Sequence, residues 1–140
     1  MGRGWLTLLA LGNVAWAAIA VGAAQHAGRL RRLLADYRGQ IAVMATGTYA
    51  MCAVDRVHAG LAVLDGEHDQ ADRLFAGALA QERSLRSRPL ETRTLHWWGR
   101  ALLQRGDTTR GLEMLTRARE LADELGMRAV TRQIGDLTGV

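Results

Sequence analysis

One short stretch of the chain places a thiol, a carboxylate and an imidazole close together, at Cys52, Asp55 and His58. A cysteine nucleophile needs a histidine base, an orienting carboxylate and an oxyanion site, and these groups must reach the substrate from separate elements. Asp55 and His58, three residues apart, share one face of an expected helix. We therefore predict a polar seam between helices rather than a nucleophilic centre.

Metal and cofactor chemistry are not indicated either. The four histidines, at positions 26, 58, 68 and 96, lack metal-ligand spacing. Glu67, His68 and Asp69 are consecutive, and consecutive residues on a helix point in different directions. The chain contains no lysine, so a phosphate-binding loop for ATP is excluded. The sequence predicts a protein that is not an enzyme and holds no metal or cofactor.

Two basic features raise the question of nucleic acid. Four arginines are expected on one face of the second helix: Arg29, Arg31, Arg32 and Arg38. Interleaved leucines make that segment an ordinary amphipathic helix. Residues 121–137 imitate a DNA-binding helix-turn-helix, but Arg132 stands where that motif needs a buried apolar residue. Binding of DNA through 121–137 is kept as an alternative, and nucleic acid is not the expected partner.

The composition is that of a folded domain with an uneven charge. The chain has 140 residues, 49% apolar and 23% charged, with one proline and one cysteine. That size allows a buried core, and the lone cysteine excludes an internal disulfide. The net charge is +4. Residues 1–54 hold five arginines against Asp36 alone, so this half is poor in acids.

Apolar residues recur at helical spacing, for example at Ala71, Leu74, Phe75 and Ala78. No run alternates apolar and polar residues, which argues against a sheet. Glycines in Asp65-Gly66 and Arg105-Gly106-Asp107 suit helix ends. These signals predict an all-α fold with seven helices, near residues 5–20, 24–36, 41–63, 68–85, 89–104, 108–125 and 128–137.

Three glycines mark an internal repeat. Gly22, Gly66 and Gly106 lie 44 and 40 residues apart. Small residues stand seven before and five after each of them: Ala15, Ala59 and Gly99, then Ala27, Ala71 and Gly111. Antiparallel helices need small side chains where their backbones come closest. The pattern predicts one domain over 1–140, with helix-pair units near 5–38, 41–85 and 89–125 and a capping helix at 128–137.

Several segments resemble known helical repeats. Residues 66–71, with Phe75 and Ala78, resemble the second helix of a tetratricopeptide repeat (TPR). With them, three further motifs resemble the C-terminal repeat region of LuxR-type ATP-binding transcriptional regulators of GC-rich bacteria: Arg88-Pro89, Arg105-Gly106-Asp107 and Glu124-Leu125-Gly126-Met127. The resemblance implies an antiparallel helix-pair solenoid. It also implies a cytoplasmic, non-catalytic module for protein–protein interaction or scaffolding, without the regulators' ATPase and DNA-binding domains.

In TPR-like arrays the first helix of each pair lines a concave face that binds the partner. Carried over to this chain, the resemblance places six residues on that face: Trp16, Arg56, Arg93, His96, Arg100 and Gln104. Arginines on such a face pair with carboxylates of a partner peptide.

The N-terminal segment allows a different interpretation. No charged residue occurs from Gly4 to Gly28, a length that can span a bilayer, and Arg3 before an apolar run also fits an export signal. Glycines, Asn13 and several alanines dilute the hydrophobicity of residues 5–24, so a buried helix is favoured over a small membrane-anchored or exported protein. An apolar first helix pair without a polar cap also leads us to expect self-association or docking to another subunit.

Overall fold

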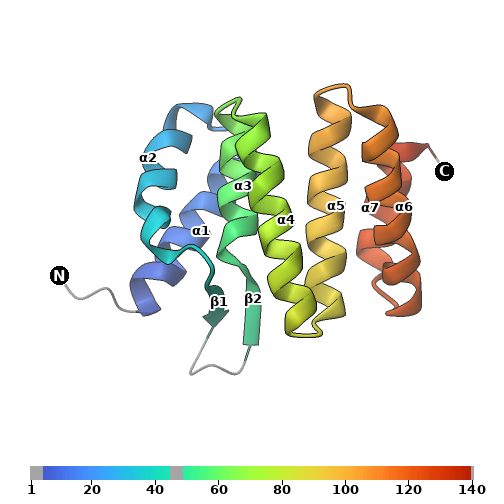
Figure 1. Ribbon diagram of the computed structural model, residues 1–140, viewed down its shortest axis with the longest axis horizontal. Coiled ribbons are helices and arrows are strands. Elements are labelled where there is room, and N and C mark those ends of the chain that lie inside the picture. Colours follow the sequence, from blue (N-terminus) through green and yellow to red (C-terminus); the bar gives the residue numbers. More distant parts are fainter. Residues whose placement is uncertain (1–4, 45–48, 140) are drawn as a thin grey trace. The chain divides into compact units, whose positions relative to one another are not determined.

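The computed structural model describes residues 5–44 and 49–139, and seven helices lie in that part of the chain (Figure 1). They are α1 (Trp5–Val21), α2 (Ala24–Leu34), α3 (Val54–Leu64), α4 (His68–Ser84), α5 (Arg88–Gln104), α6 (Thr108–Glu124) and α7 (Arg128–Thr138). A short 3-10 helix, η1 (Ala35–Tyr37), follows α2. The expected all-α class is confirmed, with most contacts between helices that are neighbours in sequence. The chain divides into two compact units, residues 1–81 and 82–140, and the division falls within α4.

The helix expected over 41–63 begins only at Val54. Two antiparallel strands precede it, β1 (Ile41–Met44) and β2 (Tyr49–Ala53), so the expectation of no sheet is wrong. Residues 45–48 lie outside the described residues. The β-branched Ile41 and Val43 and the aromatic Tyr49 favour strands, and this short uncharged run has no helical periodicity to oppose them.

Backbone hydrogen bonds connect the hairpin to α3. Gly39 has a φ of +72°, a left-handed conformation that turns the chain before β1. Its N–H donates to Asp55 Oδ1 at 3.2 Å, and the N–H of Val54 donates to the Gln40 carbonyl at 2.9 Å. Strand β1 and the first turn of α3 are therefore held together at one point.

Five helices end in the same kind of turn. Each turn contains one residue in the left-handed conformation. Along the chain these residues are Gly22, Gly66, Arg86, Gly106 and Gly126. At Gly106, for example, the N–H donates to the Leu103 carbonyl at 3.0 Å, and the next N–H, of Asp107, donates to the Leu102 carbonyl at 2.9 Å. This pair of bonds satisfies carbonyls that the helix end leaves free. From Gly66 onward the turn recurs every 20 residues, and α4, α5 and α6 have 17 residues each.

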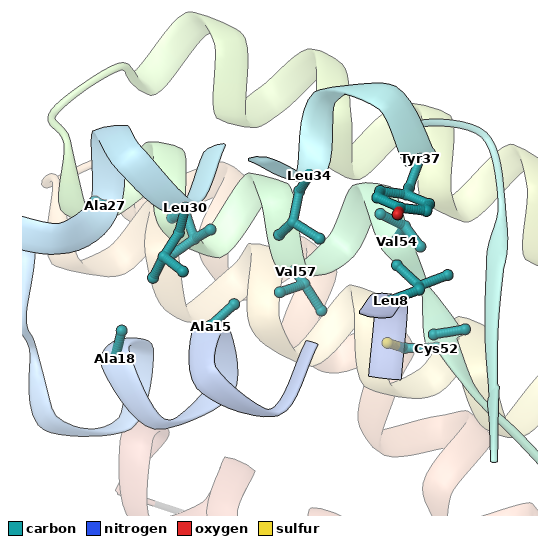
Figure 2. Packing of buried hydrophobic residues seen from close by; sticks show 12 residues of the cluster. Leu8, Ala15, Ala18, Ala27, Leu30, Leu34, Tyr37, Cys52, Val54 and Val57 are labelled. Carbon is teal, nitrogen blue, oxygen red and sulfur yellow. The ribbon is translucent and has the colours of Figure 1, made fainter. Parts of the chain in front are cut away.

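Buried side chains form the core of the unit made by residues 1–81 (Figure 2). Helix α1 packs on both α2 and α3 in this unit. Ten of the packed side chains are labelled in Figure 2: Leu8, Ala15, Ala18, Ala27, Leu30, Leu34, Tyr37, Cys52, Val54 and Val57. The small residues predicted at the first crossing, Ala15 and Ala27, are both completely buried.

In the unit made by residues 82–140, α5 and α6 approach so closely that only glycine fits at their crossing. A Cβ added at Gly99 would lie 2.7 Å from Leu115 Cγ and 3.0 Å from the Gly111 carbonyl oxygen. A Cβ at Gly111 would lie 3.1 Å from the Gly99 carbonyl oxygen. The predicted small residues at this closest approach are therefore confirmed.

Replacing either glycine should push the two helices apart. We expect Gly99→Ala or Gly111→Ala to lower the free energy of unfolding by about 1–3 kcal/mol, because overpacking outweighs the better helix propensity of alanine. Chemical denaturation followed by circular dichroism measures this. Gly77→Ala is the matched control, since a Cβ there meets only Asp55 Oδ2 at 3.5 Å. It should be stabilising by about 0.5–1 kcal/mol, and equal effects of all three substitutions would contradict the crossing.

Arg86 is the one left-handed residue among the five turns that is not glycine, with φ of 53°. A side chain in this conformation costs roughly 1 kcal/mol, so Arg86→Gly should raise the free energy of unfolding by about 0.5–1 kcal/mol. Gly106→Arg introduces the same strain in an equivalent turn and should lower it by a similar amount. Thermal and urea unfolding of both variants test these two predictions. A destabilised Arg86→Gly protein would refute the strain at position 86.

Candidate functional site

Helix α5 is buried over most of its surface. Beyond its first turn its exposed residues are Arg93, Arg100 and Gln104, which share one side of the helix. Between them lie the half-buried Trp97 and the buried His96, 7% exposed. We call these five residues the α5 stripe. Four of the six residues expected on a partner-binding face, namely Arg93, His96, Arg100 and Gln104, are thus brought together on one helix.

No carboxylate in the described part of the chain neutralises the charges on the α5 stripe. Neither Arg93 nor Arg100 forms an ion pair with a carboxylate of the described residues. The other arginines of α5 and α6 all do: Arg88 pairs with Glu124, Arg110 with Asp107, Arg117 with Glu91 and Arg119 with Asp123. The two free guanidiniums therefore leave a local positive potential that favours an anionic partner.

The pKa of His96 is lowered in this environment. Its pKa is lowered to about 4, first by burial and then by the charges of Arg100 and Arg93. Both causes disfavour the imidazolium form. At neutral pH the side chain between the two arginines is therefore an uncharged imidazole.

The other two expected residues, Trp16 on α1 and Arg56 on α3, belong to the unit made by residues 1–81. Trp16 is half-buried. Arg56 is 0% exposed, so its guanidinium is not available to a partner's carboxylate in this structure, and we correct that assignment. Its apolar neighbours in sequence, Val54, Val57 and Ala59, are buried with it.

The group Cys52, Asp55 and His58 lies around the start of α3. Cys52 is 2% exposed and lines an apolar recess, while Asp55 accepts the Gly39 N–H and pairs with Arg38 at 3.6 Å. His58 is buried, and its Nδ1 makes no hydrogen bond within the described part of the chain. Burial, followed by the nearby Arg31 and Arg38, lowers the pKa of His58 to about 4 against the opposing effect of Asp55. The geometry is that of a polar seam.

The expected basic face of the second helix is only half present. Arg31 donates to Asp65 Oδ2 at 2.6 Å and also bonds to Gln70, and Arg38 lies beyond η1. Arg29 and Arg32 remain exposed on α2. The mismatch arises because Asp65 and Gln70, distant in sequence, reach α2 only in the folded chain.

Three further observations concern the alternatives. In α7, Val130 and Ile134 are buried, and Arg132 is exposed. No helix within residues 5–44 and 49–139 is long and apolar enough to cross a membrane; Arg3, which the export interpretation used, lies outside them. Nor does the described part of the chain contain a group of three or more His, Cys, Asp or Glu residues that could hold a metal ion.

Comparison with known proteins does not narrow the function. No family model, curated protein or solved structure matches the chain. The function must therefore be argued from the geometry of the chain itself.

The two buried histidines make stability depend on pH. Each has a pKa near 6.5 when unfolded and about 4 when folded, so the unfolded chain binds more protons between these values. The contribution of these histidines to the free energy of unfolding should be greatest above pH 6.5. It should fall towards pH 4, by roughly 2–3 kcal/mol for each histidine. Urea titrations across this range test it. His96→Gln should reduce the dependence of the free energy of unfolding on pH. Each protein is compared with its own value at pH 8, where both histidines are neutral. An unchanged dependence on pH would contradict the assignment.

Proposed function

We propose that this chain is a non-catalytic, TPR-like protein-interaction or scaffold module, and that its α5 stripe binds an acidic segment of a protein partner. The observation that carries the proposal is the pair of exposed, unpaired guanidiniums of Arg93 and Arg100 on an otherwise buried helix. The resemblance to TPR segments supports it, since α5 is the first helix of the α5–α6 pair. Packing between helices two apart, α1 on α3 and α5 on α7, also suits an array of helix pairs.

The distance between the two arginines sets the spacing of carboxylates in a ligand that binds both. Arg100 follows Arg93 by seven positions, which corresponds to about 10 Å along a helix. Two carboxylates at that distance occur seven residues apart on a partner helix, or three apart on an extended segment. Arginine binds carboxylates through two parallel hydrogen bonds, which gives direction as well as attraction. An acidic peptide with either spacing is the expected ligand.

The residues between the arginines suit such a ligand. The uncharged His96 can donate or accept a hydrogen bond without adding a third positive charge. Trp97 is half-buried and offers part of its ring to an apolar side chain of the partner. In the α5 stripe a less polar centre thus lies between the two charged residues, Arg93 and Arg100.

Charge reversal tests the proposal. Arg93→Glu combined with Arg100→Glu should reduce the affinity for a synthetic peptide with two glutamates seven residues apart by at least about tenfold. Fluorescence anisotropy measures this, and added salt should weaken binding to the unchanged protein.

Arg128→Glu with Arg132→Glu is the matched control. Both residues are exposed on α7, and their reversal changes the net charge by the same amount. This control should bind the peptide almost as well as the original protein. Equal losses in the two double variants would refute the α5 stripe. Binding of a DNA duplex that only the α7 reversal abolishes would favour the alternative at 121–137.

A further inference from the structure

His96 lies between the two arginines of the α5 stripe. It follows Arg93 by three positions and precedes Arg100 by four, and residues at these spacings are neighbours on a helix surface. His96 is only 7% exposed, whereas both arginines are exposed. A proton on the imidazole would therefore have little water to stabilise it and two positive charges beside it.

The other charged groups around α5 do not offset these two arginines. Helices α6 and α7 pack on α5 in the unit made by residues 82–140. The carboxylates of these two helices are all exposed, at Glu113, Glu120, Asp123, Glu124 and Asp136. Their cations are Arg110, Arg117, Arg119, Arg128 and Arg132. The end of α4 in this unit carries Glu82 and Arg83.

Glu91, on α5 itself, lies against Arg83 and Arg117. Within the described residues, no carboxylate raises the pKa of His96, which burial lowers first, followed by Arg100 and Arg93.

An acidic ligand changes this electrostatic environment. Carboxylates bound to Arg93 and Arg100 neutralise the two charges that oppose protonation of His96, and they place negative charge beside the imidazole. A nearby opposite charge favours the charged form of an ionisable group. The imidazolium also has two N–H donors where the neutral ring has one, so it can donate a further hydrogen bond to a ligand carboxylate.

We infer that an acidic segment binds to the α5 stripe together with a proton, which His96 takes up. The inference rests on the proposed function, because it needs an acidic ligand on the α5 stripe. The ligand and the proton strengthen each other's binding by the same factor. The affinity for the ligand therefore rises as the pH falls, provided that the ligand's own carboxylates stay ionised.

The size of the effect depends on how far the ligand restores ordinary titration of His96. The pKa of this side chain is about 4 in the free protein, against 6.5 for an unperturbed histidine. Partial to full restoration should make the affinity at pH 5.5 about three- to tenfold higher than at pH 7.5. Glutamate has an ordinary pKa of about 4.3, so a glutamate ligand remains mostly ionised across this range.

Fluorescence anisotropy at pH 5.5 and pH 7.5 tests the coupling, with the synthetic peptide that has two glutamates seven residues apart. The original protein should bind more tightly at pH 5.5 by the factor given above. His96→Gln has no imidazole to protonate, so the ratio of its two affinities should be close to one. His26→Gln, which removes an exposed histidine of α2, is the matched control and should keep the full ratio. An equal ratio in the original protein and His96→Gln would overturn the inference.

Proton uptake by the original protein tests the coupling even where His96→Gln does not fold. Titration calorimetry at pH 5.5 in two buffers of different ionisation enthalpy should show uptake of most of one proton for each peptide bound. In an NMR titration, the midpoint for the His96 imidazole should move to higher pH when peptide is added. Binding without proton uptake, and with equal affinity at both pH values, would overturn the coupling alone. Failure of the peptide to bind at either pH would overturn the proposed function and the coupling with it.

Discussion

The left-handed residue that ends five of the helices is the constraint on which the other contacts depend. Its two backbone hydrogen bonds satisfy terminal carbonyls and reverse the chain within three residues, so the next helix begins at a set distance. The direction of each helix then follows from the one before. Gly99 and Gly111, placed seven before and five after Gly106, meet at the α5–α6 crossing for this reason. Contact between their backbones is a consequence of the turn as much as of their size.

The charge on α5 follows from how the neighbouring carboxylates are used. Glu91 lies against both Arg83, at 2.8 Å, and Arg117, at 3.9 Å. Asp107 likewise lies near both Arg105 and Arg110. Each of these two carboxylates is thus shared between two arginines. Arg93 and Arg100 pair with neither of them, and burial followed by the charges of Arg100 and Arg93 lowers the pKa of His96.

The unit made by residues 1–81 uses its polar residues differently. Asp55 holds the turn before β1, and Arg31 connects α2 to Asp65 and Gln70. These contacts leave α1 as the helix whose outer side is neither charged nor covered. The exposed side of α1 is thus apolar, whereas that of α5 carries Arg93 and Arg100.

Helical spacing and turn glycines, both local properties, were enough to place most of the helices within a residue or two. The same local pattern indicated small residues at the α5–α6 crossing. The grouping of Arg93, His96, Arg100 and Gln104 was instead an expectation from the resemblance to TPR segments. The sequence did not indicate which distant segments pair with each other. Strand β1 forms because β2 pairs with it, and an uncharged apolar run is compatible with either a strand or a buried helix. Whether an arginine is buried like Arg56, paired like Arg31 or free like Arg93 depends on which groups the folded chain brings to it, and only the tertiary structure decides that.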